Sequence, residues 1–332
     1  MKRLSFNIFS RYREMLMGLA IISILIFHYT EDCSLVGINY VGFVKYYKTY
    51  IGSSGVDIFL LLSGLGLYYS YSKNNNLKDF YIKRIKRVLV PYFIIAIPVY
   101  IWYDLIYLSD GILSLLKNLF FVTLFTNNNI LFWYIFFIII CYLLFPLIFK
   151  FIHRDNSYVG SFKISLIIIL FLLGIFLIYK FYPGIFNSYN IMLLRLIPFI
   201  LGILLGKMSY RSTKIEYSFI LFILGIGTIV LIRRNLIYNR LFLFIFLLSI
   251  FFWIIYFLDF LKNKENIIVR FFSFFGKYSL EIYLVHVAIR KIIKSYGYPT
   301  YKVGYYLIFI LVSIIVSILF NKLIKKILRI KN

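Results

Sequence analysis

Apolar runs long enough to cross a bilayer recur along almost the whole chain. A membrane-spanning helix needs about 20 mostly apolar residues, and 62% of the 332 residues are hydrophobic while 15% are charged. No soluble globular domain needs this much apolar surface. The sequence therefore predicts an all-α, polytopic membrane protein. About ten transmembrane helices are expected, near residues 15–33, 52–72, 89–108, 131–151, 163–182, 191–207, 217–232, 241–261, 279–296 and 304–324.

The basic residues indicate how these helices are oriented. Most of the 37 Lys and Arg residues fall in loops on the same side as the two chain ends, so both termini are predicted to be cytoplasmic. The net charge of +25 is then explained by topology and by contact with anionic lipid headgroups. Nucleic acid is not an expected partner, because no extramembrane domain is present to carry a binding patch. Residues 1–332 are predicted to form one transmembrane domain.

The cysteines and the remaining motifs indicate neither a disulfide nor a metal or nucleotide site. Cys33 and Cys141 are predicted to lie outside the membrane and within the fourth helix, so a structural disulfide is not expected. There is no residue cluster for a metal and no phosphate-binding glycine loop. The apolar stretch from Ile112 to Phe125 is short for a span and is a candidate for a re-entrant or interfacial helix.

Ionisable residues inside the first two apolar runs predict a reactive site. His28 ends the first run, and Asp57 begins the second within Gly55–Gly64. Ionisable groups at membrane depth cost roughly 2.5 kcal/mol or more, so they tend to mark functional sites. If the two runs are consecutive spans, both side chains lie at a similar depth on the same side.

A dense basic patch lies at the cytoplasmic entrance of the predicted third helix. Arg84 and Arg87 are three residues apart and share a helical face. Two guanidinium groups offer planar forks of donors that suit phosphate. Anchoring at the cytoplasmic membrane surface by the positive-inside rule is the simpler explanation. The patch itself is compatible with either phosphate binding or anchoring.

Further polar and aromatic residues have structural explanations beside functional ones. Trp133 and Tyr134 are typical of an interfacial aromatic belt. Arg195 could reach the outer interface or fill a buried role, while Gly202 and Gly206 favour close helix packing. A polar stripe on the ninth predicted helix should face a cavity or a partner helix; it comprises Ser279, Tyr283, His286 and Arg290.

Taken in order, these segments resemble the acyltransferase-3 family of integral membrane acyltransferases. The resemblance covers almost the whole chain. It rests on Leu25–His28, Gly55–Phe59 with Ser63–Gly64, Arg84 and Arg87 with Pro91–Tyr92, Trp133–Tyr134, the stretch from Arg195 to Gly202, and Ser279–His286.

The resemblance implies a ten-helix enzyme of the cell membrane, typically the bacterial plasma membrane, that takes an acetyl group from cytoplasmic acyl-CoA. The acceptor would be a hydroxyl of a surface carbohydrate or glycolipid, and acetyl-CoA would be a donor substrate rather than a permanently bound cofactor. His28 would be the general base, with Asp57 orienting it. Arg84 and Arg87 would hold the coenzyme A phosphates. Acceptor or oxyanion binding falls to Trp133, Tyr134, Arg195, Glu281 and His286.

One family feature is missing. Family members carry an Arg on the first helix, and the matching position is Met17. Arg13 lies one turn earlier on the same face and is an alternative partner for His28. His286 is a rival general base.

Two other functional classes remain alternatives. A carrier or flippase also places His, Asp and Arg inside a helical bundle, although no two-fold repeat is evident in the sequence. A non-catalytic relative that only binds a partner is the third class. Release of free thiol from acetyl-CoA would separate the enzyme from both.

Overall fold

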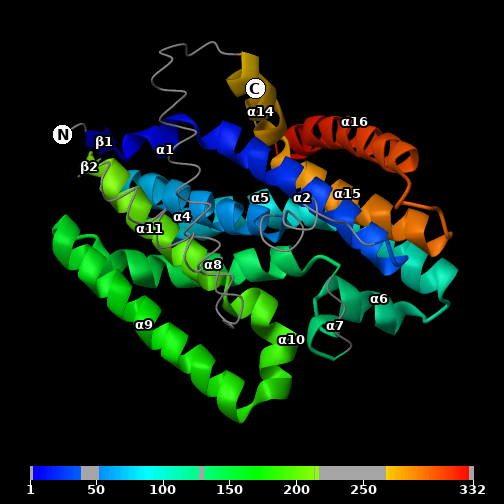
Figure 1. Cartoon of the computed structure of the whole chain (residues 1–332), viewed down its shortest axis with the longest axis horizontal. Coiled ribbons are helices and arrows are strands. Elements are labelled where there is room, and N and C mark those ends of the chain that lie inside the picture. The colour runs from blue at the N-terminus through cyan, green and yellow to red at the C-terminus, as the bar shows by residue number, and fades with distance from the viewer. Residues whose placement is uncertain (1–2, 39–51, 127–130, 213, 217–266, 329–332) are drawn as a thin grey trace. The chain divides into compact units, whose positions relative to one another are not determined.

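The computed structural model describes residues 3–38, 52–126, 131–212, 214–216 and 267–328. Its described elements are helical apart from one short antiparallel pair of strands, β1 (Arg3–Ser5) and β2 (Lys214–Glu216), in which Leu4 pairs with Ile215 (Figure 1). The all-α prediction is confirmed, with this pair as the one addition in the described part of the chain.

Helices make up nearly all of the described part of the chain. In chain order they are α1 (Asn7–Arg11), α2 (Arg13–Leu35), η2 (Gly52–Ser54), α4 (Gly55–Lys73), α5 (Leu77–Tyr100), η3 (Ile101–Tyr107), α6 (Ile112–Leu119), α7 (Thr123–Thr126), α8 (Trp133–Ile152), α9 (Ser157–Phe181), α10 (Pro183–Leu193), α11 (Leu196–Tyr210), α14 (Ile267–Lys277), α15 (Ser279–Ser295) and α16 (Val303–Ile327). Local signals explain some boundaries. The Asn156 side chain, for example, accepts a hydrogen bond from the Val159 N–H and caps α9.

Within the described residues, five helical segments are long and apolar enough to cross a membrane. They are Arg13–Leu35, Leu77–Tyr107, Trp133–Ile152, Val159–Phe181 and Val303–Ile327. These segments confirm five of the predicted spans.

The other predicted spans have mixed outcomes. Those at 52–72, 191–207 and 279–296 correspond to helices that are shorter or less apolar, and the sixth is interrupted between α10 and α11. The spans at 217–232 and 241–261 lie outside the described residues. The count of ten and the cytoplasmic location of both termini therefore stay predictions.

The chain divides into two compact units. Unit 1 contains Met1–Phe27, Val41–Asn76 and Leu143–Lys277, and unit 2 contains His28–Tyr40, Leu77–Tyr142 and Tyr278–Asn332. Helix α2 passes from unit 1 to unit 2 at His28, and α8 passes from unit 2 to unit 1 after Tyr142.

In unit 1, α4 and α11 pack closely along small residues (Figure 1). A Cβ atom added at Gly202 would overlap the Leu61 backbone, and one at Gly206 would lie 2.6 Å from the Tyr68 Cβ. Gly64 on α4 makes the reciprocal close approach to the Phe199 carbonyl. The predicted packing role of Gly202 and Gly206 is confirmed, because only glycine allows this backbone distance.

In unit 2, α15 packs against α5 and α16. After α5 the chain forms a π-helical turn, η3, which carries the buried side chain of Asp104. The Asn118 amide donates to both carboxylate oxygens of Asp104, at 2.9 and 3.0 Å, and the Thr123 hydroxyl donates to Asn118 at 2.6 Å. This network fastens α6 and α7 to η3. Residues 112–125 thus form two short helices, each too short to span a bilayer.

Candidate functional site

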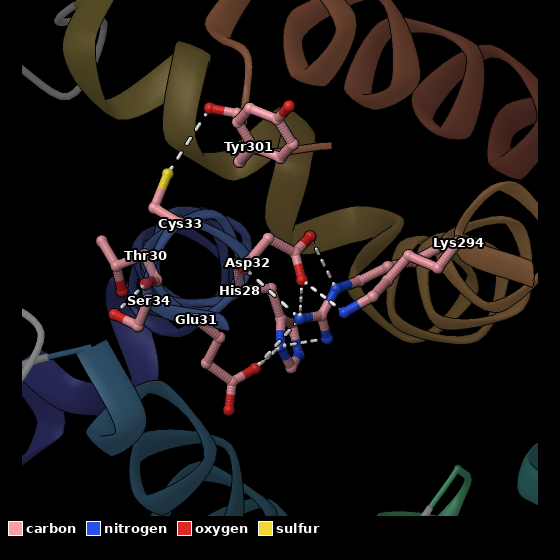
Figure 2. Close-up of polar contacts among 9 residues, drawn as sticks. His28, Thr30, Glu31, Asp32, Cys33, Ser34, Lys294 and Tyr301 are labelled. Carbon is pink, nitrogen blue, oxygen red and sulfur yellow. Dashed lines mark hydrogen bonds and ion pairs between the residues drawn. The ribbon is translucent and has the colours of Figure 1, made fainter. Parts of the chain in front are cut away.

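The last turns of α2 place His28 beside two carboxylates. Glu31 and Asp32 follow His28 by three and four residues, so all three lie on one helical face. The His28 Nδ1 and Glu31 Oε2 atoms are 2.7 Å apart, and the Asp32 side chain is 2% exposed. Figure 2 shows His28, Glu31 and Asp32 extending from α2 on the side where Lys294 is drawn.

Helix α15 supplies two cations to these acids. The Arg290 guanidinium donates to Asp32 through both Nε and Nη2, and its Nη2 also lies 3.3 Å from Glu31 Oε2. The Lys294 ammonium donates to Asp32 at 2.8 Å (Figure 2). Two cations and two carboxylates balance one another. The whole cluster therefore has no net charge when the His28 imidazole is neutral. The neutral imidazole is the form that a general base requires.

Nδ1 of His28 has two neighbours with opposite demands. Glu31 can only accept a hydrogen bond there, whereas Arg290 Nη1, at 2.9 Å, can only donate one. When Nδ1 carries the proton it donates to Glu31, and the lone pair is then on Nε2. In the Nδ1–H tautomer, Nε2 is therefore the nitrogen that can accept a proton, and Glu31 would stabilise the imidazolium that then forms.

A row of ring contacts continues from His28 along unit 2. The rings of His28 and His286 are 5.3 Å apart, those of His286 and Tyr283 are 5.9 Å apart, and those of Tyr283 and Tyr134 are 5.2 Å apart. The row joins α2, α15 and the start of α8. Three predicted site residues, His28, His286 and Tyr134, are therefore brought into one region.

The other predicted residues of unit 2 lie apart from this row or at its margin. Trp133 packs against Tyr134 and Phe137. Glu281 accepts a hydrogen bond from the Asn321 amide of α16 at 2.7 Å, so it ties α15 to α16. On α5, Arg84 is half-buried beside Tyr142, while Arg87 is exposed.

Asp57 and Arg195 meet in unit 1. Both are 5% exposed, and Arg195 Nε lies 3.7 Å from Asp57 Oδ1. Arg195 precedes the first residue of α11, at the break after α10, so its side chain enters the unit from a helix end. Its role is a buried one rather than that of an interfacial side chain. The orienting of His28 by Asp57 stays a prediction, and the described carboxylate partner of His28 is Glu31.

The sequence model of an acyltransferase domain, that of the acyltransferase-3 family, matches residues 14–322. The chain belongs to this family. No curated protein and no solved structure matches it. The matched segment includes every residue of both polar clusters described above, and the five long apolar helices agree with a membrane acyltransferase.

In this acyltransferase, the described guanidinium partner of His28 comes from α15. Met17 occupies the position at which the family resemblance leads one to expect an Arg, and Arg290 is the guanidinium that contacts His28. Arg13 instead donates through Nε to the Leu62 carbonyl of α4, at 3.3 Å within unit 1. The partnership of Arg13 with His28 stays a prediction.

Sequence reasoning missed three residues of the polar cluster around His28: Glu31, Asp32 and Lys294. A signal was present, because acids three and four residues after a histidine share its helical face. Lys294 likewise continues the α15 stripe one turn beyond Arg290. Which of these groups pair could not be read from the sequence, since it depends on how α2 and α15 pack.

Proposed function

We propose that this acyltransferase moves an acetyl group from cytoplasmic acetyl-CoA to a hydroxyl of a surface carbohydrate or glycolipid at the bacterial plasma membrane. The observation that carries the proposal is the 2.7 Å contact between His28 and Glu31, in a cluster that contains two carboxylates and two cations. A neutral imidazole backed by a carboxylate is suited to accept a proton from a hydroxyl.

The proposed reaction has two proton transfers, and the acyl carbon exchanges its C–S bond for a C–O bond. His28 Nε2 takes the proton of the acceptor hydroxyl as its oxygen attacks the thioester carbonyl carbon. Collapse of the tetrahedral intermediate breaks the C–S bond, and the departing thiolate takes the proton from the imidazolium. Glu31 stabilises the charge on His28 between these steps. Asp32 and Arg290 hold that face of α2 against α15.

The donor is assigned to the basic entrance of α5. Arg84 and Arg87 would bind the coenzyme A phosphates, because guanidinium forks form paired, charge-assisted hydrogen bonds to phosphate oxygens. Tyr134 is assigned to the acceptor, since its ring belongs to the row that leads to His28.

The direct test uses purified protein in lipid nanodiscs with acetyl-labelled CoA. Wild-type protein should release free thiol and, with envelope extract added, should transfer label to glycan. Glu31→Gln should lower the turnover about 10-fold or more, because the imidazolium loses its charged partner. Asp155→Asn, in which another part-buried carboxylate that pairs with Lys163 is neutralised, is the matched control. A wild-type protein that binds acetyl-CoA or glycan without releasing thiol would favour a carrier or a non-catalytic relative.

A further inference from the structure

His286 has a buried nitrogen whose hydrogen-bonding capacity is unused. Its side chain is 0% exposed, and Nδ1 lies 2.8 Å from the Ile282 carbonyl, to which it can only donate. The proton of the neutral imidazole is therefore on Nδ1, and Nε2 carries a lone pair. Nε2 has no hydrogen-bond partner among the described residues. A buried polar atom in this state needs a ligand or another explanation.

The surroundings of His286 indicate what it can accept. His28 and Tyr283 face it through their rings, and Arg290 is one turn further along the same helix. The described carboxylates of this region, Glu31 and Asp32, contact His28, Arg290 and Lys294. A proton on His286 would thus lie near a guanidinium, with only a main-chain carbonyl behind the ring. His286 is suited to accept a hydrogen bond and poorly suited to keep a proton.

The two histidines therefore differ in role. His28 has a carboxylate behind its ring, which stabilises the imidazolium, whereas His286 has a neutral carbonyl. His286 cannot stabilise the oxyanion of the tetrahedral intermediate either, because that oxygen needs donors and Nε2 is an acceptor. What remains as its partner is a donor group that keeps its proton, such as a second hydroxyl of the substrate.

We propose that His286 Nε2 binds a hydroxyl next to the one that His28 deprotonates, so that the acceptor is a diol or polyol. The inference deepens the proposed acyl transfer and rests on it. The 5.3 Å between the ring centres is short enough for one sugar ring to meet both imidazoles. His286 is then a binding and specificity residue, and the rival assignment of His286 as the general base is set aside.

The test compares two substitutions of similar size. His286→Gln places an amide oxygen near the position of Nε2, which can accept a hydrogen bond but cannot take a proton. His286→Leu can do neither. His153→Leu, a part-buried histidine of unit 1 that contacts Tyr68, is the matched control. Membranes containing each variant receive acetyl-labelled CoA, and label in envelope glycan is measured beside thiol release by hydrolysis, both per amount of folded protein.

We expect His286→Gln to keep glycan labelling within ~5-fold of wild type. His286→Leu should lower glycan labelling ~10-fold or more beyond any fall in hydrolysis. Hydrolysis is less affected because water, as the acceptor, has no second hydroxyl for His286 to bind. NMR of the wild-type product locates the acetyl group, and the carbon next to the acetylated one should carry a free hydroxyl.

Three results would overturn the inference while leaving the acyl transfer intact. In the first, Gln and Leu abolish transfer and hydrolysis alike, which assigns His286 as the base. In the second, both substitutions leave the ratio of transfer to hydrolysis unchanged. In the third, the acetylated position has no neighbouring hydroxyl. No thiol release by wild type would instead refute the proposed function itself.

Discussion

Each unit places an arginine beside a buried carboxylate, but the two arrangements differ in what surrounds the pair. In unit 1, Asp57 and Arg195 approach to 3.7 Å at the break between α10 and α11. In unit 2, Arg290 bonds Asp32 twice and also contacts His28, while Lys294 supplies a second cation to Asp32. Among the described contacts, the arrangement in unit 2 joins an ion pair to an imidazole.

The difference explains why ionisable residues at membrane depth are not equivalent as evidence for catalysis. Burying an ion pair costs desolvation free energy that its attraction offsets only with good geometry and further hydrogen bonds. Unit 2 has those further bonds and fixes the ring of His28 with them. The described contact of the unit 1 pair joins the helix break before α11 to α4, and the catalytic role of Asp57 stays a prediction.

The largest expected effect is at His28. His28→Ala should lower acceptor-dependent turnover at least ~100-fold, since removing a general base typically costs about 10²–10⁴ in rate. Thiol release and acetyl-CoA binding are measured together, and binding should change little because the imidazole acts on the acceptor. Wild-type turnover should fall as pH is lowered through one ionisation, because protonation removes the lone pair on Nε2. Turnover that survives in the Ala variant would assign the His28 cluster a structural role, that of holding α2 against α15.

A pair of exchanges tests whether the arginines differ in connectivity. Arg195→Met and Arg290→Met should each destabilise the protein by about 3–5 kcal/mol, since each leaves a buried carboxylate without its guanidinium. Adding Asp57→Leu to the first should restore most of that stability. Adding Asp32→Leu to the second should not, because Lys294 then lacks Asp32, and Glu31 has lost its contact with Arg290. Thermal unfolding in nanodiscs measures all four variants, and equal recovery in both units would remove the distinction.

Arg84 and Arg87 sharpen the comparison as arginines assigned to a ligand. Substituting both with Ala should weaken acetyl-CoA binding roughly 100-fold or more, because each of the two charge-assisted contacts is worth about 1.5–3 kcal/mol. Stability should be little affected, and Lys replacements should rescue in part. Lys83→Ala with Lys86→Ala, exposed positions of the same helix, is the control. Equal binding in both double variants would leave the patch with its anchoring role.

Labelling tests the predicted orientation and should not alter activity. A cysteine at Ile38, after α2, should react with an impermeant thiol reagent in intact cells, whereas one at Asn75, between α4 and α5, should be protected. The native Cys33 and Cys141 are both buried, which keeps the background low. Reversed labelling would put Arg84 and Arg87 on the side away from cytoplasmic acetyl-CoA.

The predictable part of this protein was the part that local pattern dictates. Apolar runs predicted the long helices α2, α8, α9 and α16 because a helix in lipid must satisfy its own backbone and expose apolar side chains. The spacing of Gly202 and Gly206 predicted close helix packing, because residues without a side chain on one helical face let two backbones approach. Span-length arguments were weaker for 191–207, where the chain breaks before α11, and for 279–296, where α15 is short and polar.

The sequence by itself determined the helical membrane class, the family and the presence of His28, His286, Arg84 and Arg87 in it. Tertiary structure alone decided the described partners: Glu31 and Arg290 beside His28, with Arg290 on a helix far along the chain, and Arg195 beside Asp57. The physical reason is that a span is specified by the side chains of one segment against lipid. A hydrogen bond between segments depends instead on the rotation and depth of two helices, which their packing fixes.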